Sequence, residues 1–594
     1  MNIFGNWGST LKRNFLSLIL SILLPTFGIS DSVMAAEQIH ASYSALEISI
    51  PISALESYAK YGIINPDLAG YYQYIPTNKL QEVRRILMQP LKISPAVAAQ
   101  FLDTQQGKFI LQRLAELIKN KSHYPKFVSQ SLRTALIAAA AEPEGLNLLN
   151  LLRKYPQNNI KIDMVSSMKI ADELEKMISE TEKTISALIQ TSKLEAAKIS
   201  QANLFPFPKL PNQPNLLARK QTIKFFDSSR NRHLSTDIYI PNTQNPAPVI
   251  VISHGLGLDS SNFRYLANHL VTNGFAVVIP NHPGSNTQQL QSLIKGNSNQ
   301  VTHPNEFKDR PLDIKYILDQ LESDSQFQHR FNLQQVGIFG QSLGGYTALA
   351  LAGAKINFQQ LQADCDHDKL RNTWNMSLLL QCQALELPNQ SGQEYNLQDT
   401  RIKAAIAVNP ITSSIFGQAG LSQIHTPIMI IGSSEDTVAP ALYEQIVPFS
   451  WITHPQKYLV MLLGGTHFST IGNSNLDSTQ MALPTDMIGD ASQAHDYINA
   501  LSLPFFQTYI AEKLEYLSYL NAAYAESISS QSLGLNLVQS LDHLKIAPTL
   551  DELTSQRLRY HFPETNPVRK RLSHTIVHFG FWLLGIGISL LHLI

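Results

Sequence analysis

The feature that most constrains this chain is a serine placed between a strand and a helix. Residues 340–345 read Gly-Gln-Ser-Leu-Gly-Gly, directly after the apolar run 336–339 and directly before the helix-forming run 346–352. A chain that turns sharply from strand to helix needs small residues around the turn and leaves the central side chain exposed above the sheet. The motif alone would be weak, because glycine and serine are common. Its position between strand and helix indicates a nucleophile, Ser342, more than an ordinary turn serine.

A serine hydroxyl is a poor nucleophile near neutral pH and needs a base, which an acid must orient. In strand–turn–helix sites of this kind the order along the chain is serine, acid, histidine. The apolar runs 428–431 and 458–463 are followed by Gly-Ser-Ser-Glu-Asp-Thr and Gly-Gly-Thr-His-Phe-Ser. We therefore predict Asp436 as the acid, in preference to Glu435, and His467 as the base. The alternatives are a surface turn residue at 436 and a structural histidine at 467.

Backbone amides are expected to stabilise the negative charge that develops during attack. One is the amide of Leu343, immediately after the nucleophile. For the other we choose the amide of Leu256, in the glycine-rich segment Ser-His-Gly-Leu-Gly at 253–257 that follows an apolar strand. We expect His254 and His282 to shape loops, with His254 as the base only if His467 fails.

Strand-like and helix-like patterns divide the chain. Residues 37–200 carry apolar residues at helical spacing and no catalytic constellation. After residue 218 the pattern changes to an expected antiparallel hairpin, 222–226 with 234–240, and then to apolar runs separated by helix-length segments, at 249–253, 275–280, 336–339, 404–408, 428–431 and 458–463. Runs that are apolar on both faces are typical of a covered parallel sheet. We predict an α/β fold with a mostly parallel sheet covered by helices, preceded by a helical domain.

At 594 residues the chain is too long for one compact core. We expect six segments. They are a signal peptide (1–36), a helical domain of unknown function (37–200), a proline-rich linker (201–218), the α/β catalytic domain (219–530), a C-terminal extension (531–575) and an apolar tail (576–594).

Both ends of the chain bear on localisation. Lys12 and Arg13 precede an apolar run and then small residues near Ala35, the order of a signal peptide, with an uncleaved anchor as the alternative. The tail 576–594 has no charge and is long enough to cross most of a bilayer core. Basic residues at 569–571 would then lie on the exported side, against the usual bias, so a tail lying in the interface or docked on the protein stays open. We expect export to a periplasm or thylakoid lumen, with membrane association through the tail.

The two cysteines, Cys365 and Cys382, lie close together in a polar insertion. In an oxidising compartment they are expected to form a disulfide, the alternative being two reduced thiols. The acidic residues beside Cys365 lack the spacing of metal ligands, so we predict a solvated loop and neither metal nor cofactor. The 46 basic and 46 acidic residues balance, which gives no attraction for nucleic acid, and we expect no such partner.

Residues 219–530 resemble the α/β-hydrolase superfamily. Within it, segments 253–257, 281–284 (Asn-His-Pro-Gly) and 310–314 (Arg-Pro-Leu-Asp-Ile) resemble platelet-activating-factor acetylhydrolases and dienelactone-hydrolase-like proteins. The resemblance implies metal-free cleavage of short or oxidised acyl esters, including those on lipids. Dienelactone hydrolases proper use cysteine as the nucleophile, so Ser342 argues against that activity.

Nearly all of the chain after residue 36 is also similar to a cyanobacterial group of hydrolases that carry an N-terminal helical domain of unknown function. Segments 37–56, 142–146 and 412–418 carry this likeness, which implies no substrate. We therefore expect a serine hydrolase that cleaves carboxylic esters, of lipids or short acyl groups, through an acyl-enzyme. The alternatives are an amidase, thioesterase or peptidase with the same residues, and a non-catalytic binding scaffold.

Overall fold

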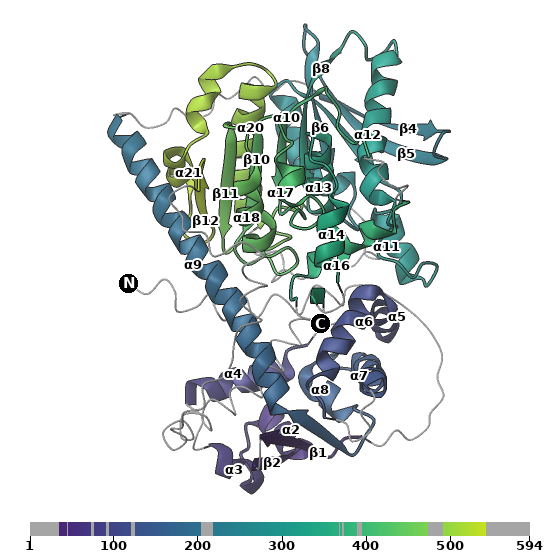
Figure 1. The fold of residues 1–594 in the computed structure, drawn as a ribbon, viewed down its shortest axis with the longest axis vertical. Coiled ribbons are helices and arrows are strands. Elements are labelled where there is room, and N and C mark those ends of the chain that lie inside the picture. The colour runs from purple at the N-terminus through teal and green to yellow at the C-terminus, as the bar shows by residue number, and fades with distance from the viewer. Residues whose placement is uncertain are drawn as a thin grey trace. The chain divides into compact units, whose positions relative to one another are not determined.

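The computed structural model describes residues 35–43, 46–72, 77–90, 94–119, 125–202, 218–366, 369–370, 373–388, 395–472 and 491–541. They fall into two compact units (Figure 1). The first comprises the described residues up to Ile178 together with 291–301, and the second comprises 179–290 and 302–541. The expected signal peptide (up to residue 34), most of the proline-rich linker (203–217) and the apolar tail (576–594) lie outside the described residues.

The first unit combines helices with a small sheet. Strands β1 (Gln38–Tyr43), β2 (Leu46–Pro51) and β3 (Asn159–Asp163) form a sheet of order β2-β1-β3, in which β1 is antiparallel to β2 and parallel to β3. The helices are α2 (Ile52–Tyr61), α3 (Pro66–Tyr72), α4 (Thr77–Met88), α5 (Pro95–Asp103), α6 (Gln105–Ala115), α7 (Pro125–Ala140), α8 (Leu148–Arg153) and the start of α9 (Met164–Ala202). The sequence analysis predicted the helices and missed the sheet, whose strands have only five or six residues each. Strand β3 joins β1 and β2 only after the intervening helices α2 to α8.

The second unit is built on a nine-stranded sheet of order β12-β11-β10-β9-β8-β6-β7-β5-β4. The strands from β7 through β6, β8, β9 and β10 to β11 are parallel, and the pairs β4–β5, β5–β7 and β11–β12 are antiparallel. The strands are β4 (Ala218–Asp227), β5 (Arg232–Pro241), β6 (Ala247–Ser253), β7 (Ala276–Asn281), β8 (Phe331–Gln341), β9 (Ile402–Val408), β10 (Ile428–Ser433), β11 (Lys457–Leu463) and β12 (Gly534–Val538).

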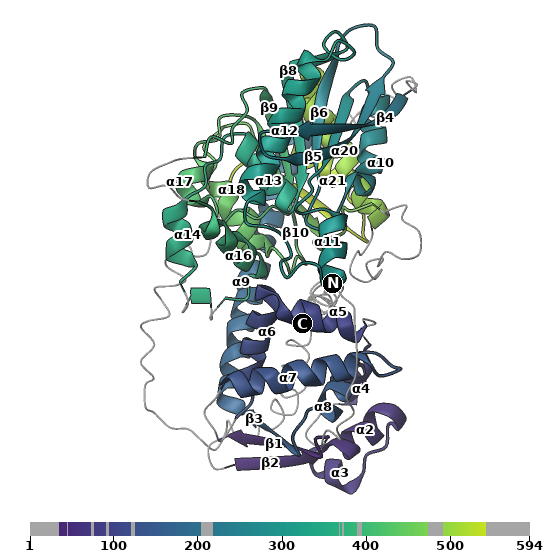
Figure 2. The same ribbon diagram turned by 90° about the vertical axis from the view of Figure 1, so that its right-hand side faces the viewer.

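Helices cover both faces of this sheet. Helices α10 (Arg264–Thr272) and α20 (Ala491–Tyr509) pack together on one face, and α12 (Glu306–Ser323) and α13 (Leu343–Leu351) pack together on the other (Figure 2). The remaining helices of four or more residues are α11 (Thr287–Ile294), α14 (Phe358–Asp364), α16 (Met376–Cys382), α17 (Gly417–Leu421), α18 (Val447–Trp451) and α21 (Ala522–Ile528), with short turns η2 (Ser260–Phe263), η3 (Gln383–Glu386), η4 (Leu442–Ile446) and η5 (Leu514–Tyr519). The predicted α/β fold with a mostly parallel, covered sheet is confirmed.

A proline inside α12 links that helix to α13. Pro311 has no N–H to donate to the carbonyl of Phe307, four residues earlier. That carbonyl instead accepts a hydrogen bond of 2.7 Å from the buried hydroxyl of Tyr346, in the first turn of α13. The carbonyl left free by the proline in α12 is thus satisfied by a side chain of α13, the helix that follows Ser342.

The sheet continues past residue 530, where the sequence analysis ended the catalytic domain. Strand β12 pairs antiparallel with β11, and its Leu535, Leu537 and Val538 are buried in the second unit. The boundary at 530 was therefore placed too early, because a single short edge strand far along the chain gives little local signal. Among the residues that the structure describes, no helix has both the length and the apolar character needed to span a membrane.

If β12 is part of this core, Leu537→Ala will lower the free energy of unfolding of the second unit by about 3 kcal/mol, the usual cost of a cavity at a fully buried leucine. Urea denaturation followed by circular dichroism measures the change. Leu517→Ala, at a side chain 45% exposed, is the matched control and should cost less than about 0.5 kcal/mol. Equal effects of the two variants would contradict the placement of β12 in the core.

Candidate active site

Ser342 lies at the sharp turn between β8 and α13, in a backbone conformation that serine rarely adopts. Its φ of 55° is in the left-handed region. The turn is tight enough that a Cβ on Gly340 would lie 1.9 Å from the carbonyl oxygen of Gly344, and a Cβ on Gly344 would lie 2.0 Å from that of Ser253. Only glycine fits at both positions. The motif therefore specifies both the turn and its close contact with the end of β6.

His467 follows β11 and Asp436 follows β10. Hydrogen bonds connect Asp436 to His467 and His467 to Ser342. The distance from His467 Nε2 to Ser342 Oγ is 2.9 Å, and that from His467 Nδ1 to Asp436 Oδ2 is 2.7 Å. The other carboxylate oxygen of Asp436 accepts hydrogen bonds from the amides of Val438 and Ala439. Because an ionised carboxylate only accepts, Nδ1 carries the proton and Nε2 can accept from the hydroxyl. The structure thus brings together the three residues singled out from the sequence.

Two buried amide side chains hold the histidine loop. Gln341 Nε2 donates to the carbonyl of His467 at 3.1 Å, and Asn409 Nδ2 donates to the same carbonyl at 3.3 Å. The Gln341 side chain also touches Gly255, where an added Cβ would lie 2.2 Å from its Oε1. The sequence analysis missed both roles, although Gln341 stands inside the serine motif and Asn409 directly follows β9.

The two amides expected to bind an oxyanion belong to segments that meet at this turn. Leu343 opens α13, so its N–H is one of the first helical amides, which have no partner within the helix. In the other segment, the carbonyl of Gly255 accepts a 2.7 Å bond from His254 Nδ1. The peptide between Gly255 and Leu256 is trans, so the Leu256 N–H points away from that ring. His254 therefore contacts a loop carbonyl, while His467 contacts the serine.

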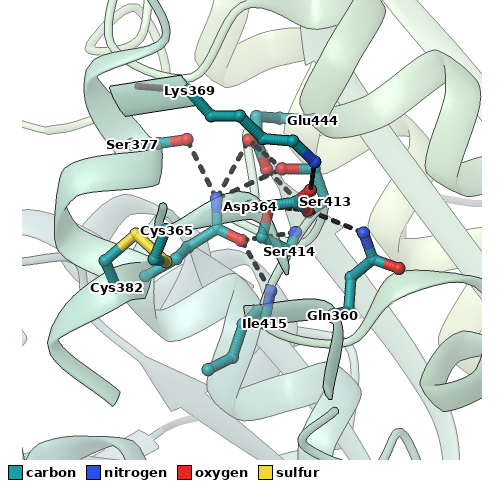
Figure 3. Close-up of a disulfide and its surroundings, with 11 residues drawn as sticks. Gln360, Asp364, Cys365, Lys369, Ser377, Cys382, Ser413, Ser414, Ile415 and Glu444 are labelled. Atoms are coloured by element: carbon teal, nitrogen blue, oxygen red, sulfur yellow. Dashed lines mark hydrogen bonds and ion pairs between the residues drawn. A yellow bond between two sulfur atoms is a disulfide. The ribbon is translucent and has the colours of Figure 1, made fainter. Parts of the chain in front are cut away.

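Cys365 and Cys382 form a disulfide across a separation of 17 residues, joining the ends of α14 and α16 (Figure 3). The residues next to them bind the loop that follows β9. Asp364 accepts a hydrogen bond from Ser414 Oγ, and the side-chain carbonyl of Gln381 accepts from two backbone amides of that loop. Among the described residues, no cluster of histidine, cysteine, aspartate and glutamate is arranged to hold a metal ion.

A buried carboxylate connects this disulfide segment to the loop that follows β9, and a backbone hydrogen bond connects the segment to the loop that carries Asp436. Glu444, fully buried, accepts hydrogen bonds from the side chains of Asn375 and Gln381 and from the backbone amides of Thr412 and Ser413. The amide of Ser377 also donates to the carbonyl of Val438, two residues from Asp436, at 3.0 Å. The disulfide segment is therefore hydrogen-bonded to the loop that positions the acid.

Beneath residues 253–257 lies a second buried network. His282 donates from Nδ1 to Asp313 at 3.0 Å, and its Nε2 lies 3.1 Å from Ser253 Oγ. Its backbone N–H donates to His254 Nε2 at 3.0 Å. Burial and the charge of Arg310 lower the pKa of both histidines well below the usual value, so both are neutral.

A pocket of about 370 Å³ lies between the start of β5 and the segments 259–261 and 281–288. All of its lining residues except Pro283 have polar side chains: His233, Ser235, Asp259, Ser260, Ser261, Asn281, Pro283, Asn286, Thr287 and Gln288. It holds none of the serine, acid and histidine described above, and it offers hydroxyl, amide and carboxylate groups to the polar part of a ligand.

Two protein families match the chain. Residues 248–361, which contain Ser342, match a family described as alpha/beta hydrolase fold. The protein belongs to the α/β-hydrolase superfamily. Residues 35–163 of the hydrolase match a family described as alpha/beta hydrolase of unknown function (DUF1400), over nearly the whole first unit. No curated protein matches the chain. The finer likeness to platelet-activating-factor acetylhydrolases stays a prediction, because neither matching family carries that description.

Reduction of the disulfide should lower the free energy of unfolding of the hydrolase by about 3 kcal/mol, because the cross-link restricts the unfolded chain over a loop of this length. Urea denaturation with and without dithiothreitol measures the effect. The double variant Cys365→Ser, Cys382→Ser is the control and should match the reduced protein with or without reductant. Identical midpoints for oxidised and reduced wild type would contradict the stabilising role.

The neutral histidines predict how stability varies with pH. In the unfolded chain they take up protons near pH 6.5, whereas the folded protein, in which the pKa of His254 and His282 is lowered, does not. The contribution of these neutral rings to the free energy of unfolding is therefore fully present above about pH 6.5 and is lost as the pH falls below that value. Urea midpoints should be nearly level from pH 7.5 to about 6.5 and should decrease from there to pH 5. A midpoint that is constant or rises would show that these rings become charged in the folded state.

Proposed function

We propose that the protein is a serine hydrolase that cleaves carboxylic esters through an acyl-enzyme intermediate. The observation that carries the proposal is the hydrogen-bonded line from Asp436 through His467 to Ser342, with distances of 2.7 and 2.9 Å, at a strained strand-to-helix turn. A nucleophile, a base and an orienting acid within hydrogen-bonding distance are the parts that acyl transfer requires. A scaffold that only bound ligands would not need these three side chains within hydrogen-bonding distance of one another.

In the first half of the reaction, Ser342 Oγ attacks the ester carbonyl carbon while His467 Nε2 takes the hydroxyl proton. Asp436 holds the ring and stabilises its positive charge. The amides of Leu343 and Leu256 bind the negative oxygen of the tetrahedral intermediate. When this intermediate collapses, the bond to the leaving oxygen breaks, and the alcohol departs with the proton from His467.

In the second half, water attacks the acyl-enzyme and gives a proton to His467. The new tetrahedral intermediate breaks its bond to Ser342 Oγ, which recovers the proton from the ring, and the carboxylic acid leaves. The same three side chains thus serve both halves, and no step needs a metal or cofactor.

The proposed substrate is a lipid or short-acyl ester. Support comes from the resemblance of segments 253–257, 281–284 and 310–314 to ester hydrolases that act on such molecules. The hydroxyl and amide side chains that line the pocket could also bind a polar headgroup. The disulfide is consistent with an oxidising, exported location. We further propose a periplasm or thylakoid lumen as that location, with the tail 576–594 at a membrane. Amides and thioesters use the same chemistry and differ in the leaving group.

A fluorophosphonate probe tests the nucleophile. Wild type should be labelled and Ser342→Ala should not. The Asp436→Asn variant should react with the probe, and hydrolyse a p-nitrophenyl ester, on the order of 10⁴-fold more slowly, because the histidine is no longer held in the correct tautomer. Glu435→Gln, at the neighbouring acid, is the matched control and should stay within about threefold of wild type.

Turnover of matched p-nitrophenyl ester, thioester and anilide substrates then identifies the leaving group. Faster hydrolysis of the anilide or thioester would replace the ester assignment by the amidase or thioesterase alternative. A folded wild type that the probe does not label would favour the binding scaffold.

A further inference from the structure

Arg310, in α12, is an unusual residue to find in the interior of this unit. Its side chain is fully buried, and among the described residues it forms no ion pair. The nearby carboxylates of Glu306 and Asp313 pair with Arg230 and Arg232. Burial lowers the pKa of Arg310 to about 10, so it stays charged at neutral pH. Burying an unpaired charge is costly, and such groups cluster at functional sites.

The guanidinium group is directed at the loop before Leu256. Arg310 Nη2 donates to the backbone carbonyl of His254 at 2.5 Å and lies 3.2 Å from Nδ1 of the same ring. The backbone N–H that Nε2 accepts leaves the ring proton on Nδ1, and an arginine side chain can only donate, so the contact with Nδ1 is no second hydrogen bond. It places a positive charge beside the ring, which opposes its protonation.

The hydrogen bonds of His254 fix its tautomer. Its Nε2 accepts the backbone N–H of His282, which can only donate, so Nε2 carries no proton. The proton of the neutral ring is then on Nδ1, which donates to the Gly255 carbonyl at 2.7 Å. That carbonyl and the N–H of Leu256 belong to one trans peptide and point in opposite directions. The Leu258 amide also donates to the Gly255 carbonyl, at the longer distance of 3.4 Å, so the ring makes the shorter of the two contacts that orient the Leu256 amide.

We propose that Arg310 is a positioning residue for the Leu256 amide and acts through His254. It anchors the carbonyl of His254 through a hydrogen bond, and its charge keeps the ring from taking up a second proton on Nε2, where the ring accepts the N–H of His282. The inference rests on the proposed function, in which the Leu256 amide binds the oxyanion. Because that oxygen becomes negative only during reaction, a misdirected amide lowers kcat and leaves KM nearly unchanged.

The deciding experiment compares Arg310→Met with Arg310→Lys, which keeps the charge. Turnover of a p-nitrophenyl ester is measured per active site, with sites counted by fluorophosphonate labelling. Arg310→Met should lower kcat about 10- to 100-fold with KM within about threefold, somewhat less than direct loss of an oxyanion donor. The kcat of Arg310→Lys should lie within about tenfold of the wild-type value.

A matched control is Arg401→Met, which removes a largely buried arginine that pairs with Asp399 and Asp319. It should lower stability and leave kcat per labelled site within about threefold. A purely structural role for Arg310 would give the same result as this control. A kcat per site within threefold of wild type for Arg310→Met would therefore overturn the proposal.

His254 provides a second pair of variants in case Arg310→Met does not fold. The side-chain amide of His254→Gln can still donate to the Gly255 carbonyl, whereas His254→Leu cannot. The leucine variant should lose 10- to 100-fold in kcat and the glutamine variant less than about tenfold. Equal kcat for the two would contradict the role of the ring.

Hydrogen exchange separates failure of this inference from failure of the proposed function. A wild type that the probe does not label would overturn the serine chemistry, yet exchange at amides 255–258 still reports the position of the loop. The Gly257 amide, for example, donates to the Ser285 carbonyl at 2.8 Å. Arg310→Met should speed exchange of these amides at least about tenfold, and Arg401→Met should not. Unchanged exchange in Arg310→Met would show that Arg310 does not position the loop.

Discussion

The backbone of Gly344 lies directly against the carbonyl of Ser253, with no space for a side chain between them. This contact joins the turn that carries Ser342 to the loop after β6. It brings the start of α13 and residues 253–257 to one place, while Gln341, on the neighbouring position of the same turn, reaches the histidine loop. The positions of the nucleophile, the base and both proposed amide donors therefore all depend on how closely these two backbones approach.

Two different kinds of interaction support the two sides of the site. On the side of the acid and the histidine, the buried carboxylate of Glu444 is satisfied by amides and hydroxyls, and the neutral side-chain amides of Gln341 and Asn409 hold the histidine loop. On the side of residues 253–257 it is a group of charges, in which Arg232 and Asp313 hold His282, and Arg310 holds His254. Charged hydrogen bonds are stronger and more directional than neutral ones, which suits the side where one peptide must keep its direction.

The parts of the site that could be predicted from the sequence are those whose chemistry is local. Ser342, Asp436 and His467 each stand in a short motif at the end of an apolar strand, so turn chemistry and strand order were enough to single them out. The roles of Arg310 and Glu444 depend on partners 56 and 32 residues away, and no local pattern marks them. The missed strands β1, β2, β3 and β12 are short, and β3 and β12 pair with strands far away in the sequence, whose proximity only the fold determines.

The hydrogen bond from Tyr346 to Phe307 makes two distant positions interdependent. Proline at 311 leaves a carbonyl that the tyrosine hydroxyl satisfies, and any other residue at 311 would bring an N–H that competes for the same oxygen. Among natural variants of this chain, positions 311 and 346 should therefore change together: a hydroxyl at 346 should accompany proline at 311, and phenylalanine at 346 should become acceptable when residue 311 can complete its own helix.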